Sequence, residues 1–301
     1  MLPAYVNTEK PGFSGHETFP FRYGWLRKAM IGTEVSSQFF GRPLALVTLG
    51  VGKNMVQSIR HWGLATRVLE DVNRSEVAPT YLGQRLIQEW DPYLEDIGSL
   101  WLIHWWLVGN PARAAAWHYV FFRWSRQEFS KSELTDHLLE WAERAAVRAT
   151  RSSITRDVDC MLRTYLPSKS SKKGVSEESF DCPLVELGLL RPLQDGDRYT
   201  FVMGPKRTLP AAIFGYALVE YMNAVRGERR TVALHDALYG VGSPGLAFKL
   251  SENALVELVE AVQVLTGGAI ELDDTAGLKQ LYLREDLDGT ELLERFYEEN
   301  V

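Results

Sequence analysis

The sequence has little cysteine, no long apolar run and no surplus of positive charge. Its two cysteines, Cys160 and Cys182, lie far apart, which argues against a disulfide framework and against a zinc site built from neighbouring residues. The most apolar stretch, residues 101–108, is followed by Gly109-Asn110-Pro111 and stops well short of the roughly 20 residues that a membrane-spanning helix needs. Because a basic and then apolar leader pattern is also missing after Met1, we expect a cytoplasmic protein without a membrane segment.

The distribution of charge matters more than its sum. A net charge of -6 argues against a protein that coats nucleic acid indiscriminately, since phosphate neutralisation needs clustered lysine and arginine. Residues 144–173 nevertheless contain eight basic residues and few acidic ones, whereas much of the acid surplus follows Glu252. A local basic face is therefore expected in the middle of the chain.

The composition is that of a folded protein with room for more than one domain. The chain has 301 residues, of which 46% are hydrophobic and 24% charged, and a domain usually takes about 100 to 150 residues. We predict a mainly α fold with small β-hairpin wings, in which tandem winged-helix-turn-helix-like units surround a central aromatic-rich helical core. The expected parts are 1–98, a winged-helix-like domain; 99–205, a central helical and second winged-helix-like domain; and 206–301, a C-terminal winged-helix-like domain.

The first unit has the pattern of a helix-turn-helix. Residues 44–49 predict one helix, Gly50-Val51-Gly52 a tight turn, and residues 53–64 a second helix whose apolar stripe runs along one side. The polar residues of that second helix are expected to point elsewhere: Lys53, Asn54, Gln57, Ser58, Arg60 and His61. In this order of elements the second helix can enter a major groove.

A second unit is indicated between residues 130 and 202. Ser130 and Glu133 have the spacing of a capping box, and residues 151–166 form an amphipathic helix with short hydroxyl and guanidinium groups on the side away from its apolar face. Residues 191–202 look like a hairpin, which would be the wing. The lysine- and serine-rich stretch 167–179 is either a solvated loop or an arm that orders on a phosphate backbone.

Two other segments have patterns that bear on both structure and function. Residues 101–124 are dense in tryptophan, tyrosine and phenylalanine, which is typical of buried core helices and, less often, of a base-stacking platform. A third helix, turn, helix and strand pattern follows residue 210, and its acidic helix, residues 253–265, favours contact with protein over contact with DNA.

The loop at residues 13–23 places His16 and Glu17 among aromatic and glycine residues. Two ionisable groups in such surroundings indicate either a functional site or a hydrogen-bonded pair that anchors the N-terminal segment. Asp157 and Asp159 are two apart on a predicted helix and do not share a face, so a metal bound by either needs partners from elsewhere. No established nuclease signature occurs in the sequence.

Several short blocks together resemble a bacterial family originally of unknown function. They are 13–19 (FSGHETF), 22–26 (RYGWL), 49–56 (LGVGKNMV), 59–62 (IRHW), 156–160 (RDVDC), 163–165 (RTY), 242–245 (GSPG) and 248–250 (FKL). The family is that of the nicking subunits of Ssp-type single-stranded DNA phosphorothioation systems, which belong to phage-defence clusters. In these clusters a cysteine desulfurase, an ATP-pyrophosphatase-like protein and an ATPase replace a non-bridging phosphate oxygen on one DNA strand with sulfur.

The resemblance implies a nicking endonuclease that acts on double-stranded DNA beside those enzymes. Phosphodiester hydrolysis needs an activated water and charge stabilisation, usually from a divalent metal held by carboxylates. We therefore take Glu17, Asp157 and Asp159 as candidate ligands of Mg²⁺ or Mn²⁺, and His16 as the candidate general base among the catalytic residues. The candidate DNA contacts are Lys53, Asn54, Gln57, Arg60, Arg151, Ser152, Ser153, Thr155, Arg156, Arg163, Lys172 and Lys173.

Two other functions stay open at the level of sequence. One is a non-catalytic winged-helix adaptor that binds DNA and recruits the sulfur-modification enzymes. The other is a transcription regulator, which would bind one palindromic operator as a dimer matched to its half-sites.

Overall fold

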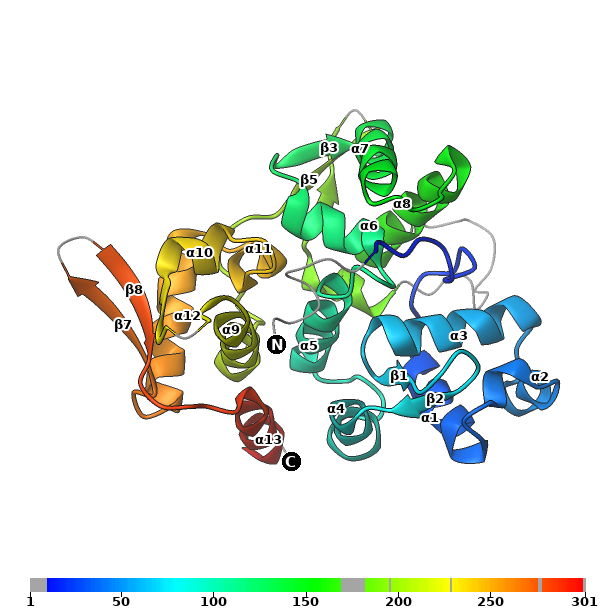
Figure 1. The fold of residues 1–301 in the computed structure, drawn as a ribbon, viewed down its shortest axis with the longest axis horizontal. Coiled ribbons are helices and arrows are strands. Elements are labelled where there is room, and N and C mark those ends of the chain that lie inside the picture. The colour runs from blue at the N-terminus through cyan, green and yellow to red at the C-terminus, as the bar shows by residue number, and fades with distance from the viewer. Residues whose placement is uncertain (1–9, 169–181, 195, 228, 276–277, 300–301) are drawn as a thin grey trace. The chain divides into compact units, whose positions relative to one another are not determined.

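The computed structural model describes residues 10–168, 182–194, 196–227, 229–275 and 278–299. Within them the chain is mainly helical with three small sheets, which confirms the expected fold class (Figure 1). The chain divides into two compact units. The larger unit contains Lys10–Tyr119 and Arg126–Thr200, and the smaller contains Val120–Ser125 and Phe201–Val301. The larger unit thus includes residues on both sides of the boundary expected after residue 98, and the three-part division stays a prediction.

The first elements of the larger unit follow the predicted order of helix, glycine turn, helix and hairpin. They are α1 (Trp25–Val35), the short 3₁₀ helix η1 (Phe39–Gly41), α2 (Leu44–Leu49), α3 (Lys53–Ala65), β1 (Leu69–Asp71) and β2 (Val77–Pro79). Gly50 ends α2 with a φ of 63°, a left-handed backbone conformation that residues other than glycine rarely adopt. The N–H of Val77 donates to the carbonyl of Ser37 at 3.0 Å, which ties the hairpin to the segment between α1 and α2.

Aromatic helices occupy the interior. The chain continues through α4 (Tyr81–Gln84), the π-helical turn η2 (Arg85–Trp90), α5 (Ile97–Val108), α6 (Ala115–His118) and the π-helical turn η3 (Tyr119–Arg123). Trp101, Trp105, Trp106 and Trp117 are each at most 1% exposed. The interpretation as a buried core is therefore confirmed, and these rings are not available for stacking on bases. None of the helices in the described residues is long and apolar enough to cross a bilayer.

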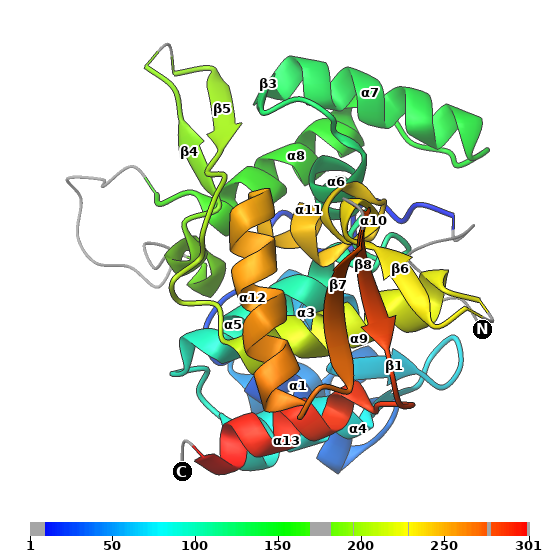
Figure 2. The ribbon, with the colours of Figure 1, turned by 90° about the vertical axis from the view of Figure 1, so that its left-hand side faces the viewer.

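The next part of the larger unit places a strand before two helices and a hairpin after them. Its elements are β3 (Glu128–Ser130), α7 (Lys131–Arg144), α8 (Arg151–Tyr165), the 3₁₀ helix η5 (Pro183–Leu187), β4 (Leu190–Pro192) and β5 (Arg198–Phe201). The sheet has the order β3-β5-β4, and Figure 2 shows β4 and β5 as a hairpin. The predicted capping box of Ser130 and Glu133 opens α7, and Thr150 and Ser153 form a second one at α8.

The smaller unit repeats this arrangement. It contains α9 (Ala211–Val225), β6 (Thr231–Ala233), α10 (Leu234–Tyr239), α11 (Pro244–Phe248), α12 (Glu252–Leu265), β7 (Ile270–Thr275), β8 (Leu278–Leu283) and α13 (Gly289–Glu299). Its sheet has the order β6-β8-β7, and α12 and α13 pack against the largely buried α9 (Figure 2). The helix, turn, helix and strand pattern expected after residue 210 is thereby confirmed.

Lys249 explains how residues 120–125 join the smaller unit. The residue ends α11 in a left-handed conformation, and its ammonium group is buried. Nζ donates to the carbonyl of Phe121 at 2.8 Å and lies 4.0 Å from the centre of the Phe201 ring. Burial lowers the pKa of Lys249 to about 7. One side chain thus fixes both stretches of chain that enter this unit.

Candidate nucleic-acid interface

The N-terminal loop, residues 13–23, is bound to both α3 and α8. The hydroxyl of Ser58 donates to the carbonyl of His16 at 3.0 Å, and the indole N–H of Trp62 donates to the carbonyl of Phe19 at 3.1 Å. From α8, a guanidinium N–H of Arg163 donates to the carbonyl of Thr18 at 2.7 Å. The loop therefore fixes two helices that are almost a hundred residues apart in the sequence.

Asp157 is the centre of this attachment. Its carboxylate, in a residue that is 2% exposed, accepts the backbone N–H of Ser14 at 2.8 and 3.1 Å and a hydrogen bond from Nε2 of His16 at 2.8 Å. The N–H of Thr18 donates to Nδ1 of His16 at 3.0 Å, so the imidazole proton is on Nε2. Neither ring nitrogen of His16 is free to take a proton from water in this arrangement.

The backbone of the loop is held in an unfavourable conformation. Ser14, Glu17 and Thr18 have φ values of 67°, 48° and 67°, in the left-handed region that costs a non-glycine residue on the order of 1 kcal/mol. At Gly15, whose φ is 91°, a Cβ atom would lie 2.7 Å from Nδ1 of His61. The bonds to α3 and α8 maintain this shape, and they leave the side chains of Glu17 and Thr18 exposed.

His61 lies in α3 beneath the N-terminal loop. Its ring centre is 5.8 Å from that of His16, and burial lowers its pKa to about 3. Within the described part of the chain, Nε2 of His61 has no hydrogen-bond partner. The expectation that Ser58 and His61 point outward was wrong, because the N-terminal loop, some 40 residues earlier in the sequence, covers that side of α3.

The three carboxylates expected to bind a metal do not converge. Glu17 is exposed, Asp157 is occupied by Ser14 and His16, and Asp159 pairs with Nζ of Lys131 at 2.5 Å. Asp157 and Asp159 diverge because residues two apart on a helix are separated by about 200°. The described residues contain no group of three histidine, cysteine, aspartate or glutamate residues that could hold a metal ion. These donors therefore do not fit a divalent metal in this structure.

Helix α8 presents the expected polar side. Arg151, Ser152, Arg156 and Arg163 are exposed, and Ser153 and Thr155 are half-buried. Arg151 forms an ion pair with Asp136 of α7. The arginine side chains also bond along the helix, since Nε of Arg156 donates to the carbonyl of Ser152 at 3.2 Å and Nε of Arg163 to that of Asp159 at 3.3 Å. The helix and its outward polar side agree with the prediction.

Helix α3 presents a smaller polar surface. Lys53 and Asn54 are exposed in its first turn, whereas Gln57 and Arg60 are half-buried. Gln57 donates to the carbonyl of Phe40 at 3.2 Å, and Arg60 pairs with Asp71 of β1 at 2.9 Å. Lys172 and Lys173, the remaining candidate contacts, lie outside the described residues.

Sequence reasoning missed the partners of the N-terminal loop. The sequence identified His16 and Asp157 separately, but no pattern paired them or indicated that Ser14, Ser58 and Trp62 would bind the same loop. The only signal was indirect: these residues lie in or near the short blocks that carry the family resemblance, and the blocks approach one another only in the fold.

The arrangement defines a class of protein: a helical protein with repeated helix, helix and hairpin units, two of whose helices are joined by an N-terminal loop that a buried His–Asp pair anchors to one of them. The chain matches the family described as "Protein of unknown function (DUF4007)" over residues 13–297 and belongs to that family.

Two solved structures confirm that the chain is an SspB-like protein, as the short sequence blocks indicated. One is described as "SspB crystal structure", with a TM-score of 0.86, and the other as "Magnesium ion-bound SspB crystal structure", with a TM-score of 0.85. Each is 30% identical to this chain, and the match covers 95% of this chain and 88% of the other. No curated protein matches the sequence.

Proposed function

We propose that this chain is a DNA-binding, DNA-nicking protein of an Ssp-type phosphorothioation system. The supporting observation is that α3 and α8, each the second helix of a helix-turn-helix followed by a hairpin, carry exposed polar side chains and are joined by one loop. In helix-turn-helix proteins this second helix enters the major groove. The likeness to SspB over 95% of the chain supports the assignment to that system.

The order of the strands supports the winged-helix interpretation. In the larger unit β3 precedes α7 and α8, the β4–β5 hairpin follows, and β5 is central in the sheet. In the smaller unit β6, α10, α12 and the β7–β8 hairpin repeat the order, with β8 central. A strand, two helices and a hairpin whose second strand is central is the arrangement of a winged helix. We therefore interpret these parts as winged-helix-like units, with the hairpins as wings.

Nicking is the finer part of the proposal and rests on the likeness to SspB. One relative is described as magnesium-ion-bound, which supports a divalent metal, and such an ion would activate water and stabilise the leaving oxygen. In this chain, however, His16 and Asp157 are fully engaged with the N-terminal loop. These two residues position the loop between α3 and α8.

A second function, the non-catalytic adaptor, is favoured by one observation: the candidate carboxylates do not meet. In either function the expected partners are double-stranded DNA and the sulfur-modification enzymes, namely a cysteine desulfurase, an ATP-pyrophosphatase-like protein and an ATPase. The expected location is the cytoplasm, where these enzymes and the DNA are.

Nicking and binding assays on one set of variants separate the functions. Supercoiled plasmid is incubated with Mg²⁺ or Mn²⁺ and wild type, Glu17→Ala, His16→Ala or Asp157→Ala. Duplex binding is measured by fluorescence anisotropy for the same proteins and for Arg156→Gln, with Arg295→Gln on the acidic helix α13 as the control of equal charge change. We expect metal-dependent relaxed circles from wild type, unchanged binding by Glu17→Ala and Arg295→Gln, and weaker binding by Arg156→Gln.

Each outcome has a distinct meaning. Binding without relaxed circles supports the adaptor, and equal nicking by every variant excludes the candidate catalytic residues. Tight binding to a single palindromic operator supports the transcription regulator. If wild type does not bind DNA, the proposal fails as a whole.

A further inference from the structure

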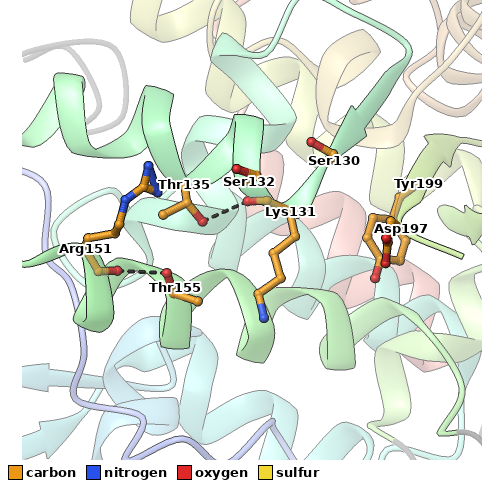
Figure 3. A pocket seen from close by; sticks show the side chains of 8 residues that line it. All are labelled: Ser130, Lys131, Ser132, Thr135, Arg151, Thr155, Asp197 and Tyr199. Carbon is orange, nitrogen blue, oxygen red and sulfur yellow. Dashed lines mark hydrogen bonds between the residues drawn. The ribbon is translucent and has the colours of Figure 1, made fainter.

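A groove of about 540 Å³ opens on the larger unit between the start of α7, the first turns of α8 and strand β5. Five hydroxyl-bearing residues line it, among them Ser132, Thr155 and Tyr199, together with the cations Lys131 and Arg151. Figure 3 shows Lys131 and Arg151 reaching in from the two helices, with Asp197 and Tyr199 on the other side of Lys131. Hydroxyl and cationic groups are the donors that proteins use to hold phosphate oxygens.

The two cations are paired crosswise between the helices. Lys131 of α7 lies 2.5 Å from a carboxylate oxygen of Asp159 in α8, and Arg151 of α8 pairs with Asp136 of α7. All four side chains are between 39% and 56% exposed. Solvent-exposed pairs of this kind are weak, so an incoming anion can replace either carboxylate.

The helix ends do not provide this groove with donors. At the start of α7 the Ser130 hydroxyl already accepts the N–H of Glu133, and the Glu133 carboxylate accepts the N–H of Ser130. The Thr135 hydroxyl, which also lines the groove, donates to the carbonyl of Lys131. The Thr155 hydroxyl likewise donates to the carbonyl of Arg151. Recognition of an anion therefore depends on the side chains of Lys131 and Arg151 and on the exposed hydroxyl of Ser132.

We propose that this groove is a phosphate-binding site for the DNA backbone, in which Asp136 and Asp159 compete with the phosphate for Arg151 and Lys131. The inference rests on the proposed DNA binding and adds a contact outside the polar side of α8. Asp197, a carboxylate in the lining, disfavours a free phosphate dianion more than a phosphodiester, which carries one negative charge. The occupant is thus a backbone phosphate of a strand that also contacts the protein elsewhere.

The test measures duplex affinity by fluorescence anisotropy between about 50 and 200 mM salt. Lys131→Gln should make the slope of log affinity against log salt shallower by about 1, and weaken binding about tenfold at low salt. Asp136→Asn and Asp159→Asn should tighten binding by up to about fivefold, because each removes a competing carboxylate. A loss of duplex affinity in Lys131→Gln together with a gain in the two aspartate variants distinguishes a phosphate site with competing carboxylates from a simple basic patch.

Matched controls lie on the same helix. Arg144 and Glu140 form an exposed pair at the other end of α7, with Arg144 about 20 Å along the helix axis from Lys131. Arg144→Gln and Glu140→Gln make the same charge changes outside the groove and should leave both affinity and slope near wild type. Circular dichroism of each variant confirms that the helices are intact.

Three results would overturn the inference. If Lys131→Gln matches Arg144→Gln and Asp136→Asn matches Glu140→Gln while wild type binds DNA, only the groove is wrong. If wild type does not bind duplex DNA, the proposed function fails and the groove with it. If inorganic phosphate at millimolar concentration binds wild type but not Lys131→Gln, while Lys131→Gln binds duplex DNA as tightly as wild type does, the groove binds free phosphate instead of the DNA backbone.

Discussion

Asp157 and Asp159 are two residues apart in α8 and have opposite environments. Asp157 is buried and accepts hydrogen bonds from Ser14 and His16, whereas Asp159 is half-exposed and pairs with Lys131. The helical repeat turns one carboxylate toward the N-terminal loop and the other toward the groove at α7. The same residue type is therefore structural in one position and replaceable in the other.

Asp157→Asn should destabilise the protein by about 2 kcal/mol. The amide nitrogen of asparagine cannot accept a hydrogen bond from Ser14 or His16, so a buried donor loses its charged partner. The free energy of unfolding in urea measures the effect. Asp159→Asn is the control and should cost less than about 1 kcal/mol, because an exposed ion pair contributes little. Equal losses in the two variants would contradict the structural role of Asp157.

His61 should make the protein acid-sensitive. Burial lowers its pKa to about 3 in the folded state, against a usual value of 6.5, so the unfolded chain takes up a proton first as the pH falls. The stabilisation present above pH 6.5 is lost progressively between 6.5 and 3. From pH 6.5 to 5 the loss due to His61 is about 2 kcal/mol.

Comparison with His61→Gln isolates this contribution. The difference in free energy of unfolding between wild type and His61→Gln should change by that amount over the same pH interval, since glutamine does not titrate. His235→Gln makes the same substitution at an exposed position on α10 and is the control for it. A constant difference between wild type and His61→Gln would show that His61 is not held neutral by burial.

At the scale of elements, α7 and α8 begin in the same way. Each has a capping box, formed by Ser130 and Glu133 in α7 and by Thr150 and Ser153 in α8. The cap fixes the first turn, and in both helices that turn carries a cation of the groove, Lys131 or Arg151. The local sequence at each capping box therefore determines the position of the groove cation in the first turn that follows.

Thr150→Ala should destabilise the protein by about 1 kcal/mol, because the first turn of α8 loses the hydroxyl that accepts the N–H of Ser153. Thr150→Ser should restore most of the stability, since serine is an equivalent cap. Thermal unfolding measures both variants. If serine fails to rescue the alanine variant, the contribution of Thr150 does not come from capping.

At the scale of the molecule, a net charge of -6 has to be reconciled with the proposed DNA binding. Lys53, Arg151, Arg156 and Arg163 are exposed on the two helices joined by the N-terminal loop, while α12 and α13 carry much of the acid surplus. Binding then depends on a local face, and the rest of the molecule opposes nonspecific association through its charge.

The affinity for duplex DNA should consequently depend steeply on salt. Five phosphate contacts, from these four residues and Lys131, each contribute about 0.9 and predict a slope of log affinity against log salt of roughly -4 to -5. Titrations at several salt concentrations measure it. A slope near zero would mean that the exposed basic residues of α3 and α8 do not meet the backbone.

The amino-acid sequence by itself determined the local features of this protein. Helix periodicity, the turn at Gly50 and the cap at Ser130 involve residues within a few positions of one another, and each was predicted correctly. Only the tertiary structure decided which polar groups are buried. The N-terminal loop covers Ser58 and His61, Asp157 meets His16 across 141 positions, and Lys131 meets Asp159 across the α7–α8 contact. Such contacts form only when segments distant in the sequence pack together, and no local sequence pattern predicts them.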